Sequence, residues 1–321
     1  MKIGGFQEAV LHVSDLRHYQ HFWQTIGGWR LLCAGSLEPQ WQAIWGLNCG
    51  GRQALLGNLG DSRGTVRLIQ LDEIPALQIR SDAQAWEVGG ILDLNIRVLD
   101  IARKHRQMQR RGWRGSSNPV RWQWGQTEII EWLGHGPDGV SLALIERIVP
   151  PLDGFANLRE FSCLINSTQI VTDLNVTRAL FEEVLDFKVV RHSIGSQQQP
   201  GENVFGLPHS LIHALPHEVI VLHPAGIIDG SIELIGFKGL SGRDFSVRAR
   251  PANLGIAALR FPVDDIGALE KRLKSHGTPI RHGPIRIPLI PYGEICMLAI
   301  QTPDGAWLEF YQQMSTAGMQ S

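Results

Sequence analysis

Hydrophobic and polar positions follow two successive periods near the start of the chain. Residues 9–13 form a β-rich apolar run, and the apolar positions from residue 16 to residue 26 then recur at helical spacing. Asp15 lies between the two segments, where its carboxylate can accept hydrogen bonds from the free N–H groups of a first helical turn. Three more strand-like runs follow, divided by Gly, Pro and Asn. The pattern predicts a strand, a helix and three further strands.

The same pattern occurs four times along the chain. The segment VSDL at residues 13–16 returns as VTDL at 171–174, and the segment DI at 100–101 returns at 265–266. Self-similarity of this kind indicates a duplicated structural unit. Each predicted helix follows an aspartate that can cap it: Asp15, Asp100, Asp173 and Asp265. We therefore expect four strand–helix–strand–strand–strand modules, over residues 1–75, 88–150, 155–240 and 252–313.

A single module of this kind has one sheet face to bury, so it would be marginal alone and is expected to pair. The prolines Pro150 and Pro151 cannot continue a helix or a central strand, and they form a natural linker between the halves of the chain. We therefore expect the first two modules to form a domain of residues 1–150. The last two modules would form a second domain of residues 151–321.

Composition narrows the functional classes. The chain has 321 residues, and its 30 Lys and Arg nearly balance its 31 Asp and Glu, which argues against a general nucleic-acid binder. Its apolar runs are strand-sized, so no membrane segment is predicted. The first residues lack the features of a signal peptide and the four cysteines show no CxxC spacing, so we expect a cytoplasmic protein. No nucleotide-binding or serine-hydrolase motif is present, and the oligomeric state stays open.

Several segments resemble the vicinal oxygen chelate superfamily, which includes glyoxalase I, extradiol dioxygenases, and fosfomycin- and bleomycin-resistance proteins. They are the string VLHVSDLRHYQHFWQTIGGWRLL, the repeated PDG before a final strand, and the module ends SIELIGF and WLEFYQ. The resemblance implies an α+β fold of four βαβββ modules, paired into two glyoxalase-like domains. Each domain would be a curved eight-stranded mixed sheet around a cavity. In enzymes of the superfamily that cavity holds a divalent metal, which chelates two neighbouring oxygens of the substrate.

The resemblance also implies where metal ligands would lie. Glyoxalase-like members take them from the opening strand of each module, usually His or Gln, and from the last strand, usually Glu. In the C-terminal half, Glu233 and Glu309 match the last-strand pattern, whereas Asn166 and Ala258 do not match the opening-strand pattern. In the N-terminal half the four positions fall on Glu8, Arg67, Asp93 and Ala143. The resemblance therefore implies one divalent metal of unknown identity, in an incomplete or atypical site at Glu233 and Glu309.

Strand residues two apart share a face, so other side chains should face the same cavities. In the N-terminal half these are His12, Arg67 and Arg97, and two arginines suit a carboxylate or phosphate of a small ligand. The same residues could instead form a Glu/Asp–Arg network that closes off an unused cavity. The sequence leaves both interpretations open.

In the C-terminal half, Trp307 and Tyr311 share the face of Glu309, and Arg260 shares the face of Ala258. With Asn166 nearby, these groups could hold a planar oxygenated ligand. The two glutamates, Glu233 and Glu309, could then act as general acid and base if burial raised the pKa of one of them. Aromatic core packing is the alternative for Trp307.

Tryptophan is unevenly distributed, because nine of the ten lie in the first 132 residues. Trp122 and Trp124 alternate along one predicted strand, where they could form a wall for a flat apolar ligand. A core filled with indole rings is the more frequent arrangement. Neither interpretation is decided by the pattern.

Two functions follow from these features. The retained Glu233 and Glu309 favour an enzyme that acts on a small oxygenated metabolite as a lyase, isomerase or dioxygenase. The missing histidines favour a metal-free small-molecule binding protein similar to the bleomycin-resistance proteins. An interaction protein with vestigial cavities is a third interpretation, since one fold hosts several functions. We favour the enzyme, with the chemistry in the C-terminal half.

Overall fold

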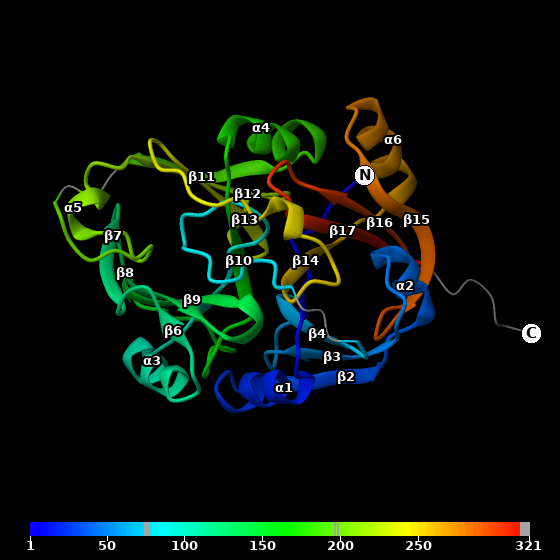
Figure 1. The fold of residues 1–321 in the computed structure, drawn as a ribbon, viewed down its shortest axis with the longest axis horizontal. Coiled ribbons are helices and arrows are strands. Elements are labelled where there is room, and N and C mark those ends of the chain that lie inside the picture. Colours follow the sequence, from blue (N-terminus) through cyan, green and yellow to red (C-terminus); the bar gives the residue numbers. More distant parts are fainter. Residues whose placement is uncertain (74–76, 196, 198, 315–321) are drawn as a thin grey trace, which may run out of the picture.

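The computed structural model describes residues 1–73, 77–195, 197 and 199–314. It contains the four expected modules in chain order (Figure 1). The first comprises β1 (Glu8–His12), α1 (Leu16–Thr25), β2 (Arg30–Ser36), α2 (Pro39–Trp45), β3 (Gly51–Gly57) and β4 (Thr65–Leu71). The second comprises β5 (Asp93–Arg97), α3 (Ile101–Gln109), β6 (Arg114–Gly115), β7 (Val120–Trp124), β8 (Thr127–His135) and β9 (Ser141–Val149).

The third and fourth modules repeat this order. The third comprises β10 (Leu164–Ile170), α4 (Leu174–Ala179) with a π-helical turn (Leu180–Val184), β11 (Lys188–Gly195), α5 (His209–Ile212), β12 (His217–His223) and β13 (Ser231–Phe237). The fourth comprises β14 (Gly255–Pro262), α6 (Ile266–Ser275), β15 (Ile280–Leu289), β16 (Gly293–Gln301) and β17 (Trp307–Gln313). Short 3₁₀ turns at Pro137–Gly139 and Ser246–Arg248 complete the helical segments of the described residues.

The four aspartates cap the main helices as predicted. The Asp15 side chain accepts a hydrogen bond from the His18 backbone N–H at 3.0 Å. Asp100, Asp173 and Asp265 accept equivalent bonds at the starts of α3, α4 and α6. Each cap satisfies N–H groups that a helix leaves free in its first turn. The helix starts are therefore determined locally.

The pairing of the modules differs from the prediction. One sheet has eight strands in the order β15-β16-β17-β14-β1-β4-β3-β2, so it joins the first module to the fourth. The other joins the second module to the third in the order β11-β12-β13-β10-β5-β9-β8-β6, and β7 pairs with β8 as a ninth strand. The expected domains 1–150 and 151–321 therefore do not each form a sheet. In Figure 1 the blue strands β2–β4 accordingly lie in the same half of the molecule as the orange and red strands β15–β17.

In each sheet, an antiparallel pair of opening strands joins the two modules. In the β1–β14 pair Glu8 lies opposite Arg260, and in the β5–β10 pair Asp93 lies opposite Thr168. All four modules offer an opening strand with a similar free edge, so the repeat pattern does not distinguish one partner from another. The side chains that meet across the pair differ, however, and Glu8 with Arg260 is a complementary pair.

Helices α1, α3, α4 and α6 cover the outer faces of the sheets and contribute to a continuous core. Phe22 of α1 stacks on Trp113, which follows α3, with ring centroids 4.8 Å apart. A separate apolar cluster fills the inner hollow of the eight-stranded sheet and includes Trp41 and Trp307. No helix among the described residues is both long and apolar enough to cross a membrane. The inner faces of the two sheets differ in what fills them.

Candidate functional site

The inner face of the eight-stranded sheet carries a buried cluster of four charged side chains. Arg67 donates from Nε and Nη2 to the two carboxylate oxygens of Glu8 at 2.8 and 2.9 Å. Arg260 joins both glutamates, since its Nη1 lies 2.6 Å from Glu8 Oε1 and its Nε lies 2.5 Å from Glu309 Oε2. All four side chains are fully buried. We call Glu8, Arg67, Arg260 and Glu309 the charge cluster.

Neighbouring groups satisfy most of the remaining polar atoms of the charge cluster. Arg67 donates from Nη1 to Gln53 at 2.7 Å and from Nη2 to the Ile290 carbonyl at 2.7 Å. Trp45, at the end of α2, donates to Glu309 Oε1 at 3.0 Å. The Arg260 guanidinium lies 4.4 Å from the centre of the Trp41 ring, also in α2. Helix α2 therefore covers the charge cluster with two indole rings.

The electrostatics of the charge cluster favour its ionised form. Burial alone would raise the pKa of Glu8, but the guanidinium groups of Arg67 and Arg260 outweigh it and hold that pKa below the ordinary range. Two carboxylates and two guanidiniums balance one another. Glu8, Arg67 and Glu309 occupy positions where the superfamily resemblance implies metal ligands, and Arg260, rather than Ala258, lies opposite Glu8. Because two of the four groups are guanidinium cations, these residues do not fit a divalent metal.

Three other predicted binding residues lie in the same hollow. His12 is buried against Trp45 with ring centroids 4.9 Å apart, and burial, followed by the Arg260 charge, lowers its pKa to about 3. Trp307 and Tyr311 pack in the apolar cluster, where Tyr311 stacks on Tyr292 at 5.3 Å. His12 is therefore neutral at physiological pH. A buried Glu–Arg network, which is the alternative interpretation of the sequence, occupies this hollow, with Arg260 Nη2 left without a hydrogen-bond partner among the described residues.

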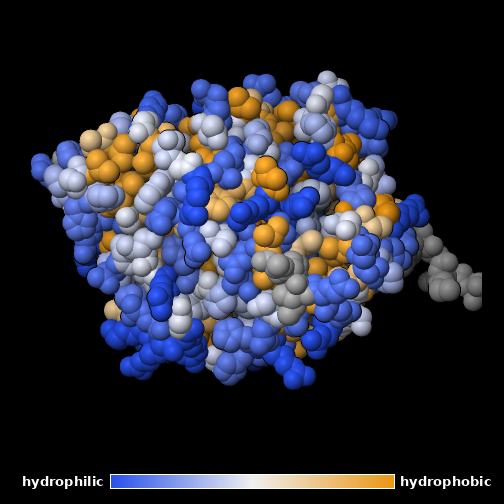
Figure 2. All heavy atoms as spheres, in the orientation of Figure 1, coloured by the Kyte–Doolittle hydropathy of each residue, from blue (hydrophilic) through white to orange (hydrophobic). Residues whose placement is uncertain are grey.

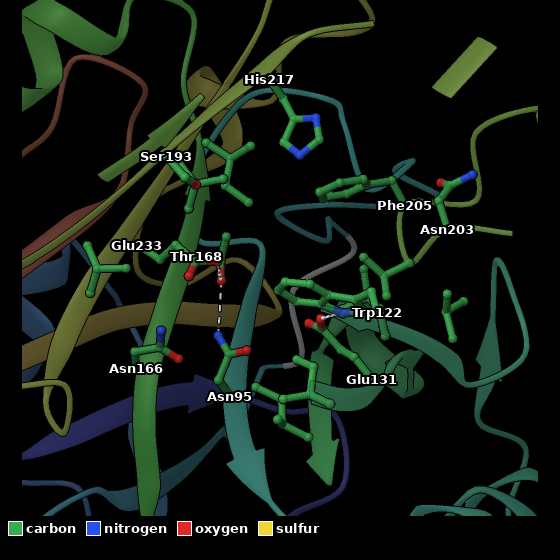
Figure 3. Close-up of a pocket in the computed structure, with 18 of the residues that line it drawn as sticks. Asn95, Trp122, Glu131, Asn166, Thr168, Ser193, Asn203, Phe205, His217 and Glu233 are labelled. Atoms are coloured by element: carbon green, nitrogen blue, oxygen red, sulfur yellow. Dashed lines mark hydrogen bonds between the residues drawn. The ribbon is translucent and has the colours of Figure 1, made fainter. Parts of the chain in front are cut away.

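The inner face of the nine-stranded sheet instead encloses a cavity of about 490 Å³ (Figure 3). This volume is in the range of small-molecule sites. Apolar atoms provide most of the lining surface, although polar and charged side chains are about as numerous as apolar ones, and the cavity continues to the rim of the sheet near Ile194, which is 60% exposed. Figure 2 shows hydrophobic surface over this part of the molecule, near α5. The cavity is therefore open to a ligand, in contrast to the charge cluster.

Four carboxyl residues line this cavity, and three of them lie on different strands: Asp93 of β5, Glu131 of β8 and Glu233 of β13, whereas Glu202 is exposed in a loop. Asn95 donates from Nδ2 to Asp93 at 3.0 Å and lies within 3.0 Å of Thr168 Oγ1. Thr168 in turn donates to Glu233 Oε1 at 3.4 Å. We call Asp93, Glu131 and Glu233 the acidic trio. Asn95 and Thr168 link two of its members through the centre of the sheet.

Glu131 is positioned by the extra strand. The indole N–H of Trp122 in β7 donates to Glu131 Oε2 at 2.9 Å, and Figure 3 shows the two side chains together at one wall of the cavity. The bond occupies one carboxyl oxygen and leaves Oε1 for other partners. The side chain of Trp124, named above with Trp122, lies outside the described part of the structure.

The acidic trio titrates near neutral pH. Burial raises the pKa of Asp93 to about 6, and burial together with the Asp93 charge raises that of Glu233 to about 7. Burial and the charges of Glu233 and Asp93 raise the pKa of Glu131 to about 8. Glu131 and Glu233 keep partial contact with solvent through the cavity, although protein surrounds both carboxyls.

The acidic trio does not form a metal centre. Across residues 1–73, 77–195, 197 and 199–314, no three His, Cys, Asp or Glu side chains converge closely enough to hold a metal ion. Neither the charge cluster nor the acidic trio, as the described residues place them, therefore has the ligands of a metal centre.

The structure separates residues that the sequence interpretation combined. Glu233 lies in the nine-stranded sheet and Glu309 in the eight-stranded sheet, so the expected joint site of these two glutamates is wrong. Asn166 lines the same cavity as Glu233. Arg97 also lines it, but its guanidinium bonds to Asp229 at 2.8 Å. Module pairing is the cause, because each sheet takes one module from each half of the chain.

Sequence reasoning missed Glu131. It lies in the strand segment IIEWL, where a single carboxylate stands between apolar neighbours on both sides. A lone charged residue inside an apolar strand is a signal of a functional or paired carboxyl, since burying an unpaired charge is costly. The superfamily resemblance gave no reason to select it, because Glu131 is not at one of the implied ligand positions.

Comparisons with known proteins agree with this fold. The structure is similar to that of glyoxalase I from Zea mays, with a TM-score of 0.64 and 17% identity over 96% of this chain and 92% of that one. It is also similar to a putative dioxygenase from Bacillus subtilis, with a TM-score of 0.58 and 13% identity over 98% of this chain and 86% of that one. At these identities the likeness shows the fold alone. A search of curated proteins gave no match.

Sequence comparison gives a family match for part of the chain. Residues 164–310 match the family described as the Glyoxalase/Bleomycin resistance protein/Dioxygenase superfamily. The matched segment runs from β10 to β17, so it spans the third and fourth modules, which lie in different sheets. The match to this superfamily therefore covers less than half of the chain and ends with these two modules.

Proposed function

We propose that the protein catalyses proton transfer on a small oxygenated compound bound in the cavity of the nine-stranded sheet, as an isomerase or lyase. The observation that carries this proposal is the acidic trio: three carboxyls with pKa values of about 6, 7 and 8 line one largely apolar cavity. General acid–base catalysis is most efficient when the pKa of the catalytic group is near the working pH. The match of residues 164–310 to the superfamily supports an activity on small molecules.

The different pKa values assign different roles. At neutral pH Glu131 is mostly protonated and can donate a proton, whereas Glu233 is partly ionised and can accept one. Asp93, with the lowest pKa of the three, is mostly ionised and favours protonation of the other two. Trp122 holds Glu131 through Oε2, and Thr168 holds Glu233 through Oε1. The chain's own residues therefore supply a donor and an acceptor without a metal.

A metal-free binding protein is the second candidate. The mostly apolar lining and the exposed apolar rim at Ile194 favour it, because such surfaces retain a hydrophobic ligand without any reaction. The two candidates share the cavity and differ in what the acidic trio does. In the binding protein the carboxyls only fix the orientation of the ligand.

Deuterium exchange distinguishes the candidates. The protein would be incubated in deuterated buffer with a panel of small ketones, aldehydes and hydroxy acids, and loss of C–H signals would be followed by proton NMR. We expect exchange on at least one compound, with Glu131→Gln and Glu233→Gln each slower by about 100-fold or more. Glu294→Gln, at an exposed residue of the other sheet, is the matched control. Binding without exchange in any compound would instead support the sequestering protein.

A further inference from the structure

We infer that the ligand of this cavity is an organic cation, with a protonated amine or amidine that lies among the acidic trio and an apolar body that packs against Trp122 and Phe205. This deepens the proposed function and rests on it for the identity of the site. The inference adds the charge class of the ligand, which neither the family nor the fold specifies.

The first observation is an unpartnered acceptor beside the acidic trio. Asn166 lines the cavity and is 7% exposed, yet its side-chain oxygen has no hydrogen-bond partner among the described residues. Figure 3 shows Asn166 on the same strand as Thr168, at the wall that also carries Glu233. A buried carbonyl oxygen without a partner is costly, so a donor from a ligand would stabilise it. This wall therefore offers acceptors and needs donors.

The second observation is the placement of the arginines that line the cavity. Arg97 bonds to Asp229 at 2.8 Å, and Arg147 donates to the Pro151 carbonyl at 3.0 Å. Arg97 is four residues from Asp93 on β5, which corresponds to about 13 Å along a strand. Each guanidinium therefore has a bond elsewhere, although Arg147 Nε has no hydrogen-bond partner among the described residues, and both arginines follow Asp93 toward the far end of the cavity.

Two other arginines act on the trio. Arg80 and Arg191 favour the ionised forms of Asp93 and Glu233 respectively, and Arg80 donates hydrogen bonds to the carbonyls of Gly89, Gln84 and Glu87. Burial, followed by the charges of neighbouring carboxyls, still raises the pKa of Glu131 and Glu233. A positive charge of a ligand beside them would therefore stabilise their ionised forms, which burial disfavours.

The third observation is the aromatic wall opposite the trio. Figure 3 shows Trp122, Phe205 and His217 across the cavity from Thr168 and Glu233. The rings of Phe205 and His217 contact each other edge to face at 5.5 Å. Aromatic faces attract cations and pack on flat apolar groups. A ligand with a charged amine at one end and an apolar body at the other matches both walls.

The inference has a signature that separates it from a ligand of the opposite charge. A bound cation favours ionised carboxylates, so Glu131 and Glu233 would release protons when it binds at neutral pH. A bound carboxylate or a neutral hydrogen-bond acceptor would favour the protonated forms and cause proton uptake. The sign of the proton transfer therefore reports the charge class of the ligand.

Calorimetric titration of the full chain tests the inference. The probes are two matched sets of similar shape: tryptamine, tryptophol and indole acetate, and phenethylamine, phenethyl alcohol and phenylacetate. Each titration is repeated in two buffers of different ionisation enthalpy, which gives the number of protons exchanged. We expect at least one amine to bind about tenfold or more tightly than its alcohol, with net proton release. Glu131→Gln and Glu233→Gln should each reduce both the preference and the release, while Glu294→Gln should keep them.

Three results would overturn the inference: equal binding of amine and alcohol, tighter binding of either carboxylate, or no detectable binding of either amine. Folding of each variant would be checked by its unfolding transition, so that a lost preference is not a lost structure. Amine preference without deuterium exchange would leave this inference standing and reject proton transfer. Deuterium exchange on a compound without an amine, together with no preference for amines, would support proton transfer and reject the cationic ligand.

Discussion

Glu8 and Arg260 are 252 residues apart in the chain, yet Arg260 Nη1 lies 2.6 Å from Glu8 Oε1 across the antiparallel pair of β1 and β14. This contact joins the first module to the fourth at the centre of the eight-stranded sheet. It also places a guanidinium where the superfamily resemblance implies a metal. One pair of residues therefore bears on both the topology and the chemistry of the protein.

Replacing Arg260 with methionine should strongly destabilise the protein. Arg260→Met leaves Glu8 with Arg67 alone and leaves Glu309 buried without a guanidinium partner, and breaking a buried ion pair in this way costs about 3–5 kcal/mol. The free energy of unfolding, measured by urea denaturation, checks this. Arg286→Met, at an exposed residue of β15, is the control and should change it by less than about 0.5 kcal/mol. A similar small effect of Arg260→Met would show that the charge cluster is not a structural element.

Glu131 should make the protein less stable as the pH rises. Its pKa is raised from 4.5 to about 8, so between these values the unfolded chain has released a proton that the folded protein keeps. Stability therefore falls with rising pH over this window. Glu131→Gln removes this loss. Between about pH 5 and pH 9 its free energy of unfolding should rise, relative to that of wild type, by on the order of 2 kcal/mol, because Glu131 keeps partial contact with solvent.

Urea denaturation of wild type and Glu131→Gln at the two pH values gives this difference in the free energy of unfolding. The contributions of titrating groups that both proteins share cancel in the comparison. Glu294→Gln is the control, because this exposed residue of β16 should leave the pH dependence of wild type unchanged. A variant that follows the wild-type curve would show that Glu131 titrates normally.

Divalent metal should bind far below one ion per chain. Two guanidiniums occupy the charge cluster, and the acidic trio does not converge on a point. Metal content after dialysis against manganese or nickel, measured by mass spectrometry, tests this expectation. About one ion per chain that is lost in Glu233→Gln or in Glu309→Gln would place a chelating site at that residue after all.

The two halves of the chain should fold only together. Each half of the chain, residues 1–150 or residues 151–321, supplies only one module to each sheet, because β1 pairs with β14 and β5 pairs with β10. Expressed alone, each half would expose the edges of its opening strands, which are prone to aggregate. Co-expression should give a stable one-to-one complex, detected by light scattering and circular dichroism. A folded monomer of residues 1–150 alone would contradict the observed pairing.

Much of the local structure could be predicted from the sequence because local forces determine it. The aspartate caps, the helical spacing after Asp15 and the strand order of each module all depend on residues that are close in the chain. The polar residues expected to face inward, such as Glu8 and Arg67, do so, because strand periodicity is a local property. The candidate site was harder, since Glu131 and Trp122 enter it through a hairpin specific to the second module.

The sequence by itself determined four βαβββ modules and which side chains of each strand turn inward. Only the tertiary structure decided which modules share a sheet. That pairing places Glu309 beside Arg260, and it places Glu233 in one cavity with Asp93 and Glu131. The physical reason is that four similar opening strands present similar backbone edges, so hydrogen bonding does not favour one partner. Complementary side chains across those edges do, and they lie 252 residues apart in the case of Glu8 and Arg260.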